Sequence, residues 1–299
     1  MAAPAPLPPS RVLDRAGKST AVRIGLAKSY RSDLYHFLMT TSWPGLIALI
    51  AGFFVAANLV FALGYLAGGP CIENARPGSF EDLFFFSVQT MGTIGYGKMS
   101  PVTLWSHLLM MVEVLVGYLW LAMATGLIFA KFSRPTARVL FSRVGVIAPR
   151  DGVPTLMFRM ANERGNQIVE AQVRVVLARS ETTAEGETLR RFHDLTLARD
   201  RNAIFALSWT VMHPITPSSL LHGVTAETLA AWDAQFVISL VGLDETISQT
   251  VHARCSYVAD DILWNHRFLD LFSRLPDGRG AMDYRNFHRT EPLPPKVVS

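Results

Sequence analysis

Two long stretches of the chain are apolar and almost free of charge. Residues 37–72 contain no Asp, Glu, Lys or Arg, and from 99 to 130 the single such residue is Glu113. A helix needs roughly 20 apolar residues to cross about 30 Å of hydrocarbon. The pattern therefore predicts membrane-spanning helices over 44–67 and 102–132. The alternative, buried helices of a soluble core, is disfavoured because core helices average about 11–12 residues.

The segment between the two spans predicts a re-entrant element. Gly68, Gly69 and Pro70 mark a loop, and Ser79 is a typical N-cap for a helix over 79–91. That helix is too short to cross, so the chain must enter the membrane and return. Non-helical backbone survives at membrane depth only where protein or a water-filled path surrounds it. Residues 93–97 follow the helix, and we expect them to line a pore.

The remaining chain differs in pattern. Residues 33–42 predict a short amphipathic helix in the headgroup layer. After residue 132, short β-branched and aromatic segments at 144–148, 155–159, 172–177, 204–209, 236–241 and 250–257 alternate with turn formers. This spacing is typical of a soluble antiparallel sandwich. The predicted organisation is a flexible basic tail over 1–32, the interfacial helix over 33–42, a membrane pore domain over 43–135, an all-β sandwich over 136–288 and a loose tail over 289–299.

Charge gives the orientation. Only 17% of the residues are charged, against about 25% in typical soluble domains. Basic residues gather before the first span and after the second: Arg11, Arg15, Lys18, Arg23, Lys28, Arg31, Lys131, Arg134, Arg138 and Arg143. The positive-inside rule places both termini in the cytoplasm and residues 68–100 outside. The net charge of +4 thus needs no nucleic-acid partner, because anionic lipid headgroups attract such residues.

The segment Thr93, Ile94, Gly95, Tyr96 and Gly97 carries the predicted chemistry. Rings of backbone carbonyls can replace the water shell of K⁺ if every carbonyl turns inward. That conformation needs positions where a Cβ would clash, hence the two glycines. The Thr93 hydroxyl can add a ring, and Tyr96 can brace the filter against the short helix. One copy supplies a quarter of each ring, which predicts a homotetramer with cyclic symmetry. The alternative is an inert extracellular loop.

Three residues of the second span are further candidates. Gly117 is either a gating hinge or a close helix contact. Phe129 would lie near the cytoplasmic exit, where its side chains from four copies can close the pore by dewetting. The alternative is that Phe129 packs against lipid or another helix. Glu113 is the lone intramembrane acid and therefore a functional candidate. It would either support the filter from behind or contribute to the electrostatic field in the cavity of the pore.

At this point the chain resembles the prokaryotic inward-rectifier potassium channels (KirBac). The resemblance is carried by Trp43-Pro44, by 86–90 (Phe-Ser-Val-Gln-Thr), by 130–135 (Ala-Lys-Phe-Ser-Arg-Pro), by 252–257 and by 261–268, in the family's order. These pieces cover about residues 33–288. Two-span channels in general lack the C-terminal ones, so the assignment is specific.

The resemblance implies more than the spacing does. The sandwich would be immunoglobulin-like and would extend the ion path into the cytoplasm of a bacterial cell, below the inner membrane. Leu243 and Ser248 would form a second constriction, and Gly117 and Phe129 match a hinge and a gate. Lys131, Arg134 and Arg138 would meet anionic lipid, including phosphoinositide-type headgroups. We further expect block by Ba²⁺, K⁺ bound at residues 93–96, and no cofactor.

Several positions depart from the family's pattern. Leu121 stands where the eukaryotic relatives have an acid, and leucine at this position predicts weak rectification through that site. Gln89 and Met99 replace a Glu–Arg brace, so filter support must come from elsewhere. With Cys71 as the single outer cysteine, the extracellular disulfide cannot form. Lys98 stands where an Asp is common, and a ring of four would lower the local cation concentration.

Three other functions compete with a potassium channel. A poorly selective cation channel is disfavoured by the intact 95–97 tripeptide. A membrane-anchored sensor, whose sandwich reads a ligand, is a rival from another class. An enzyme is the weakest alternative because the histidines are scattered, without metal-ligand spacing or a nucleophile motif.

Overall fold

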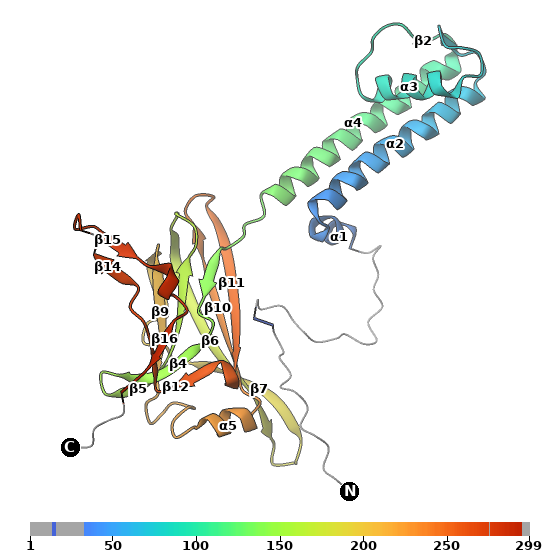
Figure 1. The fold of residues 1–299 in the computed structure, drawn as a ribbon. Helices are drawn as coiled ribbons and strands as arrows, with labels where there is room; N and C mark the ends of the chain where they lie inside the picture. The colour runs from blue at the N-terminus through green and yellow to red at the C-terminus, as the bar shows by residue number, and fades with distance from the viewer. Residues whose placement is uncertain (1–13, 16–32, 275, 295–299) are drawn as a thin grey trace, which may run out of the picture. The chain divides into compact units, whose positions relative to one another are not determined.

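The computed structural model describes residues 14–15, 33–274 and 276–294. It divides into two compact units: residues 25–134, and residues 1–24 together with 135–299. The predicted fold class is confirmed, since a helical membrane unit precedes an all-β unit (Figure 1). The predicted flexible tail over 1–32 lies outside the described residues except for Asp14 and Arg15.

Three helices form the frame of the membrane unit. They are α1 (Leu34–Thr40), α2 (Trp43–Ala67) and α4 (Leu104–Phe132). The Ser42 hydroxyl caps α2, and Thr103 forms a capping box with Ser106 at the start of α4. Such caps satisfy the backbone N–H groups that a first helical turn leaves unpaired. Both long helices expose large apolar side chains along their length, which suits a lipid environment.

The re-entrant helix is α3 (Phe80–Met91), with Ser79 as its N-cap. It packs against α2 and α4 through a cluster that includes Ala62, Tyr65, Leu83 and Phe86. Two short strands, β1 (Ile72–Glu73) and β2 (Ser100–Pro101), pair in antiparallel fashion on either side of the α3 and filter segment. This pairing brings the two ends of the loop together.

Two five-stranded sheets make up the sandwich (Figure 1). One has the order β11-β10-β6-β7 with β8 on β6, and the other β12-β4-β5-β3 with β9 on β5. The bounds are β3 (Val139–Phe141), β4 (Gly145–Arg150), β5 (Val153–Asn162), β6 (Ile168–Thr182), β7 (Thr188–Leu195), β8 (Arg201–Phe205), β9 (Ser208–Pro214), β10 (Gln235–Asp244), β11 (Gln249–Val258) and β12 (Ile262–Trp264).

Smaller elements complete this unit. They are α5 (Ala226–Ala231), the 3-10 turns η1 (Ala259–Asp261) and η2 (Tyr284–Asn286), and the strands β13 (His266–Phe268), β14 (Phe272–Arg274), β15 (Gly280–Met282) and β16 (Thr290–Pro292). The sandwich core lies between the sheets and includes the fully buried Phe158, Phe205, Phe236 and Tyr257. The rings of Phe158 and Tyr257 stack with centroids 4.7 Å apart, and burial of such large side chains stabilises the unit.

Two predictions about the sandwich are wrong. The expected strand over 204–209 is broken at Ala206–Leu207, and its halves belong to different sheets: β8 pairs with β6, and β9 with β5. The apolar run could not reveal a strand that changes sheets. The expected loose tail over 289–299 is ordered at its start, because β16 pairs with β13. That pairing joins segments distant in sequence and has no local signal.

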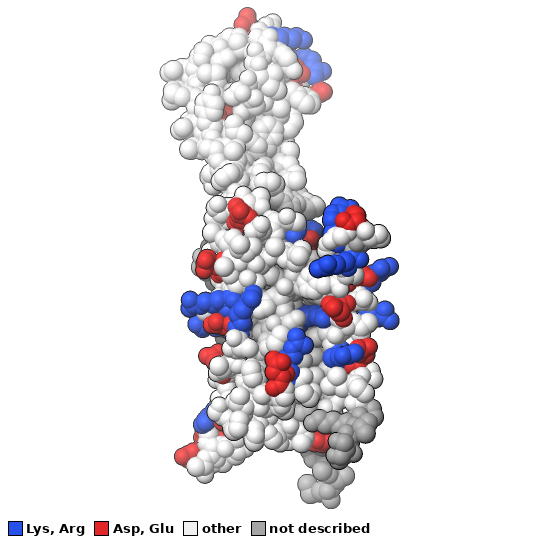
Figure 2. All heavy atoms as spheres, turned by 90° about the vertical axis from the view of Figure 1, so that its left-hand side faces the viewer, with Lys and Arg blue, Asp and Glu red and all other residues white. Residues whose placement is uncertain are grey.

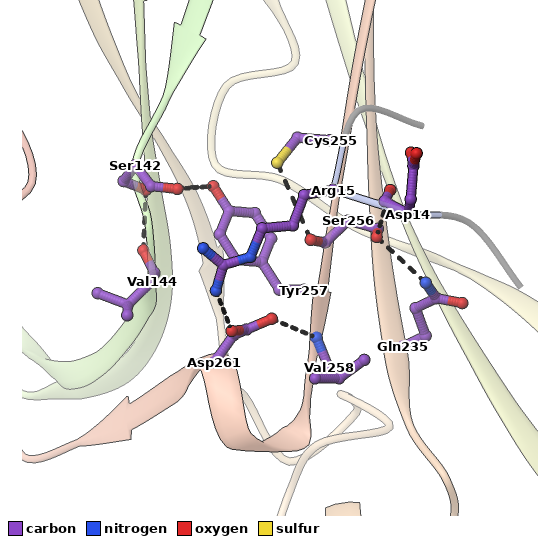
Figure 3. Close-up of polar contacts among 10 residues, drawn as sticks. All are labelled: Asp14, Arg15, Ser142, Val144, Gln235, Cys255, Ser256, Tyr257, Val258 and Asp261. Atoms are coloured by element: carbon purple, nitrogen blue, oxygen red, sulfur yellow. Dashed lines mark hydrogen bonds and ion pairs between the residues drawn. The ribbon is translucent and has the colours of Figure 1, made fainter. Parts of the chain in front are cut away.

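The N-terminal residues Asp14 and Arg15 lie against the end of β11 (Figure 3). The Arg15 guanidinium forms an ion pair with Asp261, and the Ser256 hydroxyl donates to the Asp14 carbonyl over 3.0 Å. Beneath them the Tyr257 hydroxyl donates to the Ser142 carbonyl over 2.7 Å. Asp14 and Arg15 therefore contact the sandwich.

The two units differ in surface chemistry (Figure 2). In this view the membrane unit is mostly uncharged, with its Lys, Arg, Asp and Glu atoms gathered mainly at one end, whereas the face of the sandwich carries such atoms side by side. This contrast is expected when one unit faces hydrocarbon and the other faces water.

Candidate functional site: the filter segment and its supports

The backbone of residues 93–97 alternates in handedness. The angle φ is +55° at Thr93, +56° at Gly95 and +78° at Gly97, whereas Ile94 and Tyr96 are not among the positive-φ residues. Alternation of right- and left-handed residues turns successive peptide groups so that their N–H groups point to one side and their carbonyls to the other. Glycine adopts positive φ freely, whereas the β-branched Thr93 does so under strain.

The last turn of α3 holds the start of this segment. The Thr93 N–H donates to the Thr90 carbonyl over 3.1 Å. The Gln89 carbonyl accepts from Ile94 N at 2.8 Å and from Gly95 N at 3.4 Å. Gln89 thus contacts the filter segment through its main chain. The side chains of Ile94 and Tyr96 are exposed in the single chain, Tyr96 to 76%.

Behind α3 lies a buried polar cluster around Glu113. The Tyr65 hydroxyl on α2 donates to the Glu113 carboxylate over 2.6 Å, and the Ser87 hydroxyl on α3 contacts the same carboxylate. Ser87 Oγ also lies 2.9 Å from Asn58 Oδ1, so its single proton serves either acceptor. Glu113, Tyr65, Ser87 and Asn58 are all fully buried. This cluster joins α2, α3 and α4 through hydrogen bonds.

At the other end of α3, Arg76 contacts the first turn of the helix. Its guanidinium and its backbone N–H donate to the Asp82 carboxylate at 2.8–2.9 Å. These hydrogen bonds lower the pKa of Asp82 well below its usual range. Asn74 Nδ2 donates to the Lys98 carbonyl over 2.9 Å, which ties the end of the filter segment to the preceding loop.

The remaining candidates on α4 take different positions. Gly117 is buried against Met91 of α3, whereas Leu121 and Phe129 are 54% and 70% exposed in the single chain. Large apolar side chains this exposed are available to a lumen, to lipid or to another copy. Their placement is compatible with the predicted gate and does not test it.

In the sandwich, Leu243 and Ser248 lie at the tip of the β10–β11 hairpin. Leu243 pairs with Thr250, and Ser248 has a φ of +50° in the connecting turn. Next to them Asp244 is buried and accepts from Arg164 Nη1 at 3.4 Å. Arg164 Nη2 also donates to Thr136 Oγ1 over 3.0 Å. One arginine therefore joins the hairpin tip to the start of this unit.

Two of the predicted lipid-binding residues contact α1. Lys131 Nζ donates to the Met39 and Thr41 carbonyls, and Arg134 Nη1 donates to the Met39 carbonyl over 3.0 Å. Cations are favourable at the C-terminal end of a helix, where carbonyls are unpaired. Arg138 is exposed. Lys131 and Arg134 thus have intramolecular partners in addition to any lipid.

Sequence reasoning missed several of these residues. Asn58 and Tyr65 lie in no motif, and Ser87 belongs to the 86–90 run without a role assigned to it, although a buried acid in a span signals that donors are near. Arg164 gave no local signal because its partners are distant in sequence. In the part of the chain that the structure describes, no group of three His, Cys, Asp or Glu residues could hold a metal ion.

The architecture defines a class of protein. Two spans, a re-entrant helix with an alternating-handed segment and a β-sandwich are the parts of a two-span ion channel with a soluble domain. Two family descriptions match the chain: "Inward rectifier potassium channel C-terminal domain" over residues 139–299, and "Ion channel" over residues 46–134.

Individual relatives agree. The chain is 53% identical over 279 residues to the inward rectifier potassium channel Kirbac3.1 of Paramagnetospirillum magnetotacticum, covering 93% of this chain and 95% of that protein. It is 31% identical to human G protein-activated inward rectifier potassium channel 1, covering 96% of this chain and 63% of the relative. Human ATP-sensitive inward rectifier potassium channel 12 is also 31% identical, with 90% and 67% covered.

The chain belongs to the inward-rectifier potassium channel family, among its prokaryotic KirBac members. It is therefore a membrane protein and a potassium channel, and it is not an enzyme.

Proposed function

We propose that four copies of the chain conduct K⁺ passively and selectively through rings of carbonyl oxygens from residues 93–97. The observation that carries the proposal is the alternation of φ at Thr93, Gly95 and Gly97. Carbonyls that point the same way in one copy form stacked rings when four copies surround an axis. The 76% exposure of Tyr96 agrees with this, because a neighbouring copy can then supply the partner of its hydroxyl.

The family's two constrictions complete the proposed ion path. Phe129 would close the helix bundle, and Leu243 with Ser248 would close the path at the hairpin tip. Anionic lipid would act at Lys131, Arg134 and Arg138, where phosphate oxygens compete with the carbonyls that end α1. Both termini would lie in the cytoplasm of a bacterial cell. The contact of Arg15 with Asp261 supports the same side of the membrane for both termini, because the N-terminal segment and the sandwich must then share a compartment.

Flux into liposomes tests this proposal. Vesicles that contain the purified protein should take up external K⁺ down its gradient in preference to Na⁺, and added Ba²⁺ should block the uptake. Gly95→Ala should abolish uptake, because alanine disfavours the positive φ there. Gly69→Ala is a matched control: Gly69 also has a positive φ, at +69°, but lies in the outer loop.

Flux that is equal for Na⁺ and K⁺ would contradict the selective filter. A protein that is folded and tetrameric yet conducts in no lipid mixture would favour the sensor function, particularly if a ligand raises the melting temperature of the sandwich.

A further inference from the structure

Gly117 lies where α4 passes the end of α3, and a side chain does not fit there. A Cβ built on Gly117 would lie 3.0 Å from Met91 Cγ and 3.1 Å from the Met91 carbonyl oxygen. One of these atoms belongs to the main chain and cannot rotate away. A Cβ on Gly126, on the same helix, would meet nothing within 4 Å. The two glycines of α4 therefore have different surroundings, and only Gly117 is required for a close approach.

Met91 is held from a second side by α2. Asn58 Nδ2 donates to Met91 Sδ over 3.4 Å and to the Phe54 carbonyl over 2.7 Å. Asn58 is fully buried and Met91 is 6% exposed. The Ser87 hydroxyl, 2.9 Å from Asn58 Oδ1, fixes the orientation of the amide. Because interiors are close-packed, Met91 cannot move away from Gly117 without disturbing this cluster.

A displacement of Met91 would also displace the first residue of the filter. Met91 is the last residue of α3. The Gly92 N–H donates to the Val88 carbonyl over 2.9 Å, and the Thr93 N–H donates to the Thr90 carbonyl over 3.1 Å. These bonds tie the first filter residue to the turn that contains Met91. A displacement of that turn therefore displaces Thr93.

We propose that Gly117, Met91 and Asn58 form a positioning contact that sets the location of the Thr93 ring and couples α4 to the inner end of the filter. The inference rests on the proposed function of residues 93–97. It assigns Gly117 to the close helix contact, the second of the two roles left open by its sequence. A glycine that acts only as a hinge would change how often the pore opens. A positioning glycine also changes how the filter binds ions.

The test compares Gly117→Ala with Gly126→Ala in the full-length protein in liposomes. Two quantities are measured: the concentration of Ba²⁺ that halves K⁺ uptake, and the ratio of K⁺ to Na⁺ uptake. For Gly117→Ala we expect each to change by about fivefold or more, the lower end of what overpacking a tight contact costs. Gly126→Ala should stay within about twofold, since its methyl group would meet nothing within 4 Å in the single chain.

A second route does not depend on the glycine. Asn58→Leu removes the donor to Met91 Sδ at similar side-chain size, and Met91→Leu removes the acceptor. Both should shift the same two quantities, so the inference stays testable if Gly117→Ala does not assemble.

The outcomes separate the hypotheses. Reduced uptake in Gly117→Ala, with Ba²⁺ sensitivity and ion ratio equal to those of Gly126→Ala, means a hinge and overturns the inference. Unchanged ratios in both leucine variants overturn it as well. Absence of K⁺-selective uptake in the unsubstituted protein would instead refute the proposed function.

Discussion

The hydrogen bond between the buried Tyr65 and Glu113 allows a test in which a double variant should be more stable than one of its single variants. Glu113→Leu replaces the carboxylate by an apolar group of similar size. Ser87 can then donate to Asn58 Oδ1, which already lies 2.9 Å away. The Tyr65 hydroxyl loses its 2.6 Å acceptor and is fully buried. Leaving a buried donor unsatisfied costs about 1–3 kcal/mol.

Adding Tyr65→Phe to Glu113→Leu should restore stability. Replacing both partners of a buried hydrogen bond by apolar groups can be nearly neutral. We therefore expect the double variant to be more stable than Glu113→Leu, with a coupling energy of about 1–3 kcal/mol. Tyr65→Phe alone should also destabilise, because the Glu113 carboxylate then keeps only the Ser87 hydroxyl as a donor.

Thermal unfolding of the detergent-solubilised assembly measures this coupling. The shift between Glu113→Leu and the double variant should be about 2–12 °C, given roughly 2–4 °C per kcal/mol for chains of this size class. Liposome K⁺ uptake should recover in the same order if the cluster supports the filter. Additive losses in the double variant would refute the reasoning, because they would mean that Tyr65 and Glu113 stabilise the protein independently.

Three further predictions concern the outer mouth, the sandwich and α1. Lys98→Gln should raise the single-channel conductance at low ionic strength, and the gain should shrink with added salt; a gain independent of salt would contradict the proposed ring of charge. His213 is buried, with Nδ1 2.6 Å from the Thr196 carbonyl and Nε2 2.7 Å from the Ser219 hydroxyl, and burial lowers its pKa. The unfolded chain then binds more protons, so the melting temperature of the sandwich should fall as the pH drops through about 6.5. His213→Gln should weaken that dependence and leave the part due to His288, whose pKa burial also lowers. Lys131→Met should speed hydrogen exchange of the α1 amides about tenfold, since it removes donors from the helix end, whereas equal exchange in the variant and the parent would contradict the role of this contact.

Local signals explain why so much of the fold was predictable. The length of the charge-free runs reflects the thickness of the hydrocarbon layer, which any spanning helix must match. The Ser79 cap and the acids after it mark the start of α3 within one turn. Gly95 and Gly97 mark positive φ because few other residues adopt it freely. Each of these constraints acts within a few residues.

Contacts between distant residues had no such signal. The acid at Glu113 was identified from its own chemistry, but its partners on α2 and α3 emerge only when the helices pack. Arg164 has partners at Thr136 and Asp244, and the break at Ala206–Leu207 depends on which sheet each half-strand joins. The pairing of β16 with β13 is likewise nonlocal. Periodicity cannot report such pairings.

The two spans, the re-entrant helix, the glycine positions of the filter and the class of the soluble domain can be predicted from the sequence, because they follow from transfer free energies and backbone sterics acting along the chain. Helix packing is needed to show which buried polar groups satisfy one another and that Gly117 contacts Met91. Those outcomes depend on how helices and sheets pack at distances of a few ångströms, and no pattern of residue types encodes that geometry.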